Sequence, residues 1–167
     1  MLKILNKVSE RLNRLCQILL VLSITILVAA MFIQILRRVF IGSTFTWVDG
    51  VARYMLIWGT FLGAAIAAKE SEHISLTFIA DKLTGKANQI FECLLYLCFA
   101  FLACYAVFAG IQAVQLVLPQ KSDSLPISVA WIYGAIPFCE AIIVFHLGVN
   151  FINKVAALAG LSAPNGG

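Results

Sequence analysis

The sequence predicts an all-α integral membrane protein with four transmembrane helices, short interfacial amphipathic helices and both termini in the cytoplasm. Three observations lead to this fold class. The chain is 62% hydrophobic and only 12% charged, its mean hydropathy is +0.96, and long apolar runs alternate with short polar segments. A soluble domain is about 45–50% apolar and about 25% charged, so this chain has too few polar residues to cover a surface that faces water.

The first apolar run follows a basic segment. Residues 1–14 carry four Lys or Arg residues with apolar residues at helical spacing, which predicts an amphipathic lead-in at an anionic membrane surface. A short ordered extension of the next helix is compatible with this pattern. A cleaved signal peptide is disfavoured because the apolar run continues to residue 36. Residues 15–36 lack charge and match the roughly 20 residues that span a bilayer, so a helix is expected over about 15–40.

The second span is expected over about 47–68. Its uncharged part, residues 54–68, is too short to cross the hydrocarbon, so the helix must begin near Trp47. Arg53 then lies in the first turns, and Asp49 precedes it by one turn, the favoured order for a helical ion pair. At 3.6 residues per turn the helix has two opposite stripes. The aromatic stripe is Trp47, Tyr54, Trp58 and Phe61, and the small-residue stripe is Ala52, Gly59, Gly63 and Ala67.

Small residues at this spacing allow helices to approach closely in a membrane, where lipid cannot itself drive helices together. Packing is favoured over a lipid-facing role for these stripes. The sequence therefore predicts a subunit-interface or packing site in this helix. Its members are Trp47, Asp49, Arg53, Tyr54, Trp58, Gly59, Phe61, Gly63 and Ala67.

The remainder of the chain completes a membrane domain over residues 15–154. Apolar residues at helical spacing beside Asp81 and Lys82 predict a short interfacial helix. Pro137 should kink the last span, and the Gly-rich tail is expected to be disordered. The expected ranges are about 74–84 for the interfacial helix, about 87–118 and 127–153 for the third and fourth spans, and 155–167 for the tail.

The orientation follows from the twelve Lys and Arg residues. Eight of them lie in the N-terminus, the connection over residues 69–86 and the C-terminus, and four lie on the other side, which favours cytoplasmic termini. Arg37 and Arg38 oppose that trend on the outer side. They are candidates, together with Lys121 and Asp123, for contact with a periplasmic protein or lipid head groups.

The cysteines and histidines indicate no cofactor, no metal and no enzyme. All five cysteines lie in apolar runs without a C-x-x-C pair, as expected of small buried hydrophobic residues. His73 lies in a polar connection and His146 in the fourth span, whereas a haem or zinc site needs several ligands placed together. A haem-anchoring redox subunit is therefore disfavoured. The sequence also shows no set of a nucleophile, a base and an orienting group of the kind that an enzyme with a covalent mechanism needs.

Glu140 is a carboxylate near the middle of the fourth span. Such a residue is by default a functional hypothesis, such as ion coupling or proton relay. A hydrogen-bonded packing contact is the alternative, and it is favoured because the same span offers no second carboxylate or basic partner. An autonomous small proton-coupled transporter that uses Glu140 stays the alternative function.

The second and fourth spans resemble a known family. The second span is similar to the pattern W-x-E-E-x-x-R-Y-x-x-x-W-x-x-F-L-G-A, with His73-Ile74 following, and the opening of the last helix is similar as well. The matching residues there are Leu125-Pro126, Trp131, Tyr133 and Pro137. Over about residues 15–154 the chain resembles the small membrane subunit (DctQ-like) of tripartite ATP-independent periplasmic (TRAP) transporters.

The resemblance implies a non-catalytic subunit of a sodium-coupled importer in the bacterial inner membrane. Its partners would be a large membrane subunit, which holds the substrate and sodium sites, and a periplasmic binding protein that delivers an organic acid such as a dicarboxylate or sialic acid. The small subunit would scaffold the large one and itself bind no cofactor. The chain departs from the pattern at Asp49, which replaces one acidic residue, and at Gly50, which stands where a second is usual.

Overall fold

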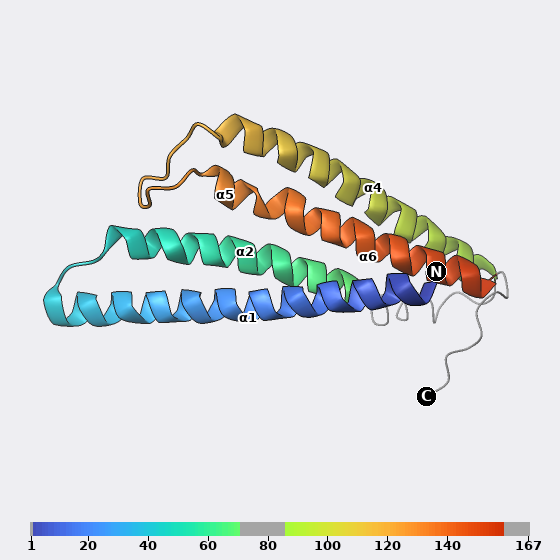
Figure 1. Ribbon diagram of the computed structural model, residues 1–167, viewed down its shortest axis with the longest axis horizontal. Coiled ribbons are helices and arrows are strands. Elements are labelled where there is room, and N and C mark those ends of the chain that lie inside the picture. The colour runs from blue at the N-terminus through green and yellow to red at the C-terminus, as the bar shows by residue number, and fades with distance from the viewer. Residues whose placement is uncertain (1, 71–85, 159–167) are drawn as a thin grey trace.

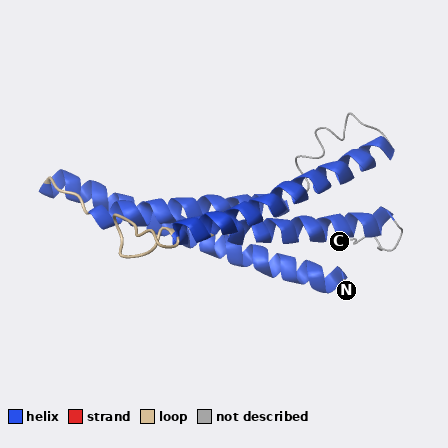
Figure 2. Ribbon diagram, turned by 90° about the horizontal axis from the view of Figure 1, so that it is seen from above, coloured by secondary structure: helices blue, strands red, loops and turns tan. Residues whose placement is uncertain are grey.

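The computed structural model describes residues 2–70 and 86–158, and these residues fold into long helices joined by short connections (Figure 2). The helices are α1 (Leu2–Ile41), α2 (Thr46–Glu70), α4 (Lys86–Val117), α5 (Ala130–Tyr133) and α6 (Ala135–Leu158). Within this part of the chain, four helical segments are long and apolar enough to cross a membrane, with α5 and α6 together forming the fourth. The predicted all-α membrane fold is confirmed. The predicted interfacial helix over 74–84, His73 and most of the predicted tail lie outside the described residues.

The helices lie side by side in the order α1, α2, α6, α4 (Figure 1). The α1–α2 turn and the α4–α5 connection lie at one end of the bundle, which we call the hairpin end. The beginning of α1 and the end of α6 lie at the opposite end, which we call the terminal end. There α1 also contacts α6, since hydrogen bonds join the first turns of α1 to the last turns of α6.

Helix α1 is continuous from Leu2 to Ile41, so the basic lead-in over residues 1–14 is not a separate element where the structure describes it. Its 40 residues correspond to about 60 Å at 1.5 Å per residue, twice the roughly 30 Å of a hydrocarbon core. The helix stops before Gly42, whose φ of 72° is a left-handed conformation that glycine adopts without strain. The Gly42 N–H donates to the Arg38 carbonyl at 3.2 Å.

The fourth predicted span, 127–153, differs from the structure at three points. It is divided at Gly134 into α5 and α6, because Pro137 has no N–H to donate to the carbonyl four residues earlier and its ring crowds that carbonyl. It begins at Ala130 and not at 127, because backbone hydrogen bonds pair residues 127 and 129 with the α4–α5 connection. It continues to Leu158, so residues 155–158, predicted as tail, are helical.

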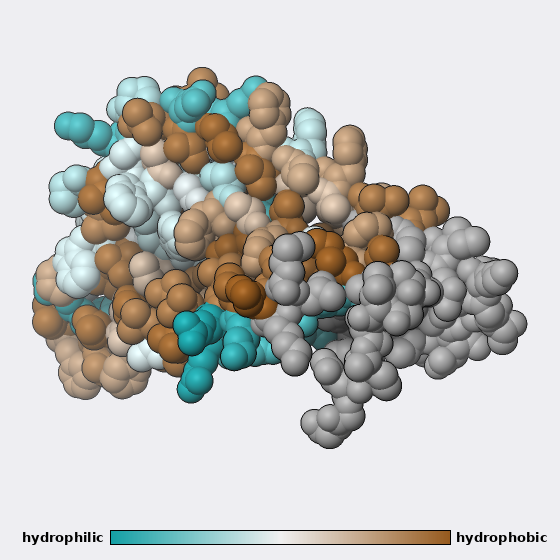
Figure 3. Space-filling model, turned by 45° about the vertical axis from the view of Figure 1, so that its right-hand side comes forward, coloured by the Kyte–Doolittle hydropathy of each residue, from teal (hydrophilic) through white to brown (hydrophobic). Residues whose placement is uncertain are grey.

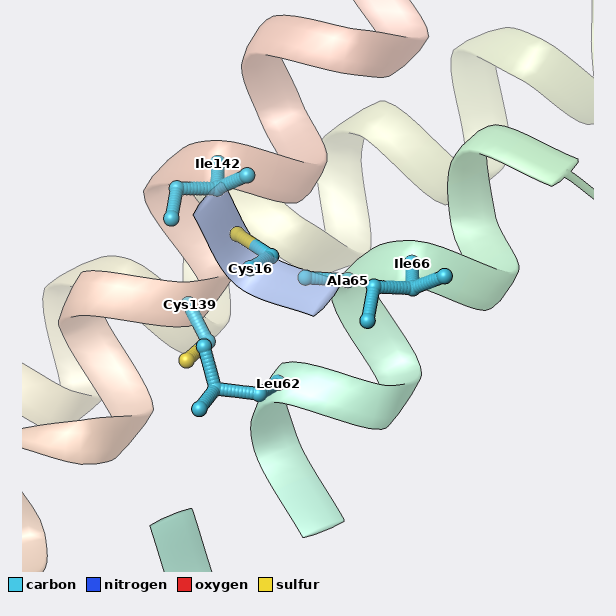
Figure 4. Close-up of a cluster of buried hydrophobic side chains, with 6 residues drawn as sticks. All are labelled: Cys16, Leu62, Ala65, Ile66, Cys139 and Ile142. Carbon is cyan, nitrogen blue, oxygen red and sulfur yellow. The ribbon is translucent and has the colours of Figure 1, made fainter. Parts of the chain in front are cut away.

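A buried apolar cluster joins α1, α2 and α6 near the middle of the bundle (Figure 4). Its members are Cys16, Leu62, Ala65, Ile66, Cys139 and Ile142. Cys16 and Cys139 thus behave as the small buried residues that were predicted, but Cys98 and Cys104 are exposed on α4 and contradict that prediction. The reason is that α4 packs mainly against α6, so most of its side chains face outward. Hydrophobic side chains cover much of the visible surface (Figure 3), as a bilayer requires.

Candidate functional site

The aromatic stripe of α2 packs inside the chain and joins α2 to the segment that begins the fourth span. Tyr54 is 5% exposed, and its hydroxyl donates to the Ser128 carbonyl at 3.2 Å. The Trp58 indole N–H donates to the Trp131 carbonyl at 3.0 Å, and the Trp58 ring lies 5.9 Å from that of Phe138. The Ser128 carbonyl also accepts the Trp131 N–H at 3.2 Å, so the Tyr54 bond adds to an existing turn, whereas the Trp58 bond reaches a carbonyl of α5, close to the break at Gly134.

The two ends of the aromatic stripe differ from its centre. Phe61 is half-buried and packs on the central apolar cluster. Trp47 is 48% exposed, and its ring lies 5.7 Å from that of Phe45, near the start of α2. The stripe as a whole is a packing surface within the chain, except at Trp47.

The small-residue stripe is divided between a packed part and an open part. Ala52 and Gly59 are buried, and a Cβ at Gly59 would lie 3.7 Å from Leu20 Cδ1 of α1. A Cβ at Gly63 would meet no atom within 4 Å, and Ala67 is exposed. Half of the stripe therefore serves the α1–α2 contact, and the other half is open in this chain.

Asp49 and Arg53, at the start of α2, do not pair with each other as the sequence predicts. Asp49 accepts a hydrogen bond from Gln34 Nε2 of α1 at 2.7 Å, so its partner is Gln34 rather than Arg53. Arg53 is exposed and borders an apolar groove between α1 and α2 that Met31 and Leu56 also line. Asp49 is thus a link between helices, because a side chain at this position points toward α1.

Gly50, the departure from the family pattern, is buried against the α4–α5 connection. A Cβ at this position would lie 2.8 Å from Ser124 Cβ and 3.0 Å from Leu125 Cγ. This spacing is too close for any side chain without movement of the connection. The second acidic residue of the family pattern therefore does not fit this backbone arrangement.

The predicted outer contact residues all lie at the hairpin end, near the end of α1 and on the α4–α5 connection (Figure 1). The Arg37 guanidinium lies 3.4 Å from the centroid of the Phe45 ring, a cation–π contact, whereas Arg38 is exposed. Lys121 and Asp123 are exposed on the connection, where an isolated β-bridge joins Lys121 to Ser128. These contacts fix the shape of a polar surface that includes charges of both signs.

Glu140 is half-buried on α6, next to the fully buried Cys139. Within residues 2–70 and 86–158, no three His, Cys, Asp or Glu side chains lie close enough together to hold a metal ion. The structure thus leaves Glu140 as a single carboxylate without a ligand set around it.

A polar contact that the sequence did not predict joins α1 and α6, and we call it the α1–α6 polar seam. Its members are Asn6, Ser9 and Asn13 on α1 and His146, Asn150 and Asn153 on α6. The Ser9 hydroxyl lies 2.8 Å from His146 Nδ1, and Asn153 Nδ2 donates to Asn6 Oδ1 at 2.8 Å. The signal was present, since each set recurs at intervals of three and four residues and so lies on one helical face. The basic and apolar residues of the lead-in obscured it.

A comparison with known families decides what this bundle is. Residues 27–157 match the model of the DctQ component of tripartite ATP-independent periplasmic transporters. The chain belongs to this family. The matched region includes the α2 stripes, the α4–α5 connection and all of α6 except its last residue, so the resemblance seen in the sequence is confirmed.

Individual relatives of this DctQ component agree with that result. The chain is 27% identical to the sialic acid TRAP transporter small permease protein SiaQ of Vibrio cholerae, over 97% of this chain and 92% of the relative. It is 24% identical to a putative TRAP transporter small permease protein of Haemophilus influenzae, over 64% of this chain and 65% of that relative. It is also 25% identical to the isethionate TRAP transporter permease protein DctMQ of Oleidesulfovibrio alaskensis, over 65% of this chain but only 18% of that relative.

Membership in this family sets the class of the protein. The chain is a transporter component and not an enzyme, and it is a multi-pass protein of the inner membrane. The family also implies a large membrane partner, in agreement with the match to one short part of the much longer DctMQ relative.

Proposed function

We propose that this DctQ component is the non-catalytic small subunit of a sodium-coupled, binding-protein-dependent secondary transporter that imports an organic acid. Its role is to scaffold the large membrane subunit, which binds substrate and sodium, while the chain itself binds no cofactor. Two relatives are named for sialic acid and isethionate, and both substrates are organic anions, which supports an organic acid as the substrate class. Both termini lie in the cytoplasm in this proposal, so the hairpin end faces the periplasm.

The observation that carries the scaffold role is the open half of the small-residue stripe. Gly63 lies in the middle of a membrane helix and has no neighbour within 4 Å of a Cβ, and Ala67, one turn away, is exposed. Small residues in membrane helices are enriched where another helix packs closely. Since α1 occupies the Gly59 half of the stripe, the Gly63 half is available to a helix of the large subunit.

This assignment is tested by changing Gly63 to Leu in cells that express both membrane subunits. The added side chain should hold the partner helix away and reduce the amount of large subunit that co-purifies several-fold. Gly148→Leu is the matched control, because Gly148 also has no neighbour within 4 Å but lies on α6. Wild-type co-purification of Gly63→Leu, or an equal loss in both variants, would contradict a specific Gly63 contact.

The non-catalytic role is tested by reconstitution in liposomes with an inward sodium gradient and a loaded binding protein. Uptake should require the large subunit and this chain together, and it should be absent with this chain alone. Uptake by this chain alone that is lost in Glu140→Gln would instead support the autonomous proton-coupled transporter.

The hairpin end supports a second part of the proposal, a docking surface for the periplasmic binding protein. Arg38, Lys121 and Asp123 are exposed there, and charged groups at the rim of an interface mainly raise the rate of encounter. The Arg38→Ala and Lys121→Ala double variant should slow association of the binding protein with the complex, more strongly at low salt. Unchanged association at low salt would remove these residues from the docking surface.

A further inference from the structure

The α1–α6 polar seam lies at the terminal end and is unusually well enclosed for polar groups. Because α1 and α6 run in opposite directions, Asn6 meets Asn153 and Ser9 meets His146. Ser9 is 2% exposed, His146 is 0% exposed, Asn13 is 8% exposed and Asn150 is 5% exposed. Buried polar side chains of this kind need hydrogen-bond partners, since an unmet one costs about 1–3 kcal/mol.

Three buried polar atoms of the seam have no hydrogen-bond partner in the structure of the described chain. They are Asn13 Oδ1, His146 Nε2 and Asn150 Nδ2. Asn13 follows Ser9 by one helical turn and Asn150 follows His146 by one turn, so each amide lies about 6 Å along its helix axis from the Ser9–His146 pair. Because the two helices are antiparallel, Asn13 lies toward the middle of the bundle from that pair and Asn150 lies toward its terminal end, so the two amides flank the pair and lie about 12 Å apart along the bundle. Gln34 Oε1 and Arg37 Nε also lack a partner, at the hairpin end.

The chemistry of these atoms selects the ligand. A carbonyl oxygen of Asn13 accepts, an amide N–H of Asn150 donates, and a ring nitrogen of His146 does either, according to the tautomer. One ion cannot reach both amides across this separation, whereas separate waters can meet each group in turn. Water both donates and accepts, and buried waters typically make about three hydrogen bonds to polar groups that the protein leaves unmet.

The position of the seam gives water a route to it. The seam begins at Asn6 and its deepest member on α1 is Asn13, whereas the uncharged part of α1 starts only at residue 15. Exposed Lys7, Arg11 and Arg14 lie on the same turns of α1, and Lys and Arg side chains extend toward the membrane–water boundary. The seam is thus level with this boundary rather than with the centre of the hydrocarbon.

We propose that the α1–α6 polar seam is an ordered-water site, in which separate waters on the two sides of the Ser9–His146 pair bond Asn13 and Asn150, and one of them also bonds His146 Nε2, so that water fastens the first turns of α1 to α6. Water bridges replace the direct side-chain pairs that Asn13 and Asn150 do not make. This site is independent of the proposed transport role, because it depends only on contacts within the chain.

The test uses histidine as the reporter, since the chain contains only His73 and His146. The full chain carrying His73→Gln, labelled with 15N-histidine and placed in lipid bilayers, has His146 as its single labelled ring. Solid-state NMR then measures the rate at which magnetisation passes from water to the ring nitrogens. We expect rapid transfer, and we expect it to fall several-fold in the Asn13→Leu and Asn150→Leu double variant.

Gln17→Leu is the matched control, because Gln17 is exposed on the same helix and bonds Glu70 outside the seam. Transfer in this variant should equal that of the parent. Each single variant, Asn13→Leu or Asn150→Leu, should reduce transfer partially, and these two serve if the double variant does not fold. Slow transfer in the parent, or transfer in either single variant that equals that of the parent, would overturn the water site.

Discussion

Two interhelical contacts at opposite ends of this bundle use hydrogen bonds in different ways. At the hairpin end, Tyr54 and Trp58 of α2 donate to the backbone carbonyls of Ser128 and Trp131. At the terminal end, side chains of α1 and α6 bond one another, as in the Ser9–His146 pair. In the first contact only one of the two bonding groups is a side chain, whereas in the second contact both of them are.

The difference shows what each contact demands of the sequence. A backbone carbonyl is present whatever residue occupies the position, so the α2 contact needs the correct donor on one helix only. A side-chain pair needs complementary residues on both helices and the correct rotation of each. The seam meets that demand at Ser9 and Asn6 but leaves Asn13 and Asn150 with unmet atoms. Close packing at Gly50 adds to the rigidity of the hairpin end.

The largest expected effect comes from breaking the close packing at the hairpin end with Gly50→Glu. A glutamate side chain must displace Ser124 and Leu125 and bury its charge, so the free energy of unfolding should fall by about 3 kcal/mol. Unfolding in mixed detergent micelles, followed by tryptophan fluorescence, measures it. Thr44→Glu is the control, because Thr44 is exposed at the same end. Equal stability of the two variants would show that Gly50 is not confined.

A smaller effect is expected at the seam from Ser9→Ala. The change removes the hydroxyl partner of Nδ1 on the fully buried His146 ring, at a cost of about 2 kcal/mol. The same unfolding measurement applies. Thr25→Val should cost much less, since the exposed Thr25 hydroxyl bonds only the Val21 carbonyl of its own helix. A loss in Ser9→Ala no larger than in Thr25→Val would mean that the Ser9–His146 bond contributes little.

The smallest effect is expected from Tyr54→Phe, which keeps the ring and removes one hydrogen bond to the Ser128 carbonyl. Stability should fall by only about 1 kcal/mol, because the Ser128 carbonyl keeps the Trp131 N–H as a donor at 3.2 Å. In the double variant of Tyr54→Phe and Ser9→Ala, the two losses of unfolding free energy should add, since the sites are distant and share no partner. A clear departure from additivity would show that the two ends of the bundle are coupled.

The sequence predicted more of the fold than of the contacts. Four spans followed from local length and apolarity, and the break near Pro137 followed from the missing N–H. The two stripes of α2 were also visible, but the sequence did not show which positions of the small-residue stripe were already packed, because the packed Gly59 and the open Gly63 have the same local pattern. Asp49 was assigned to Arg53 by spacing, whereas the neighbouring helix supplied Gln34.

The sequence by itself determined that the chain is a four-span membrane component of its family, since hydrophobicity, helix length and a motif within one helix are local properties. Only the tertiary structure decided which faces are occupied. The Ser9–His146 pair joins residues 137 positions apart, and its formation depends on how α1 and α6 are rotated about their own axes. That rotation is set by packing of all the helices together, so no single segment of the sequence contains it.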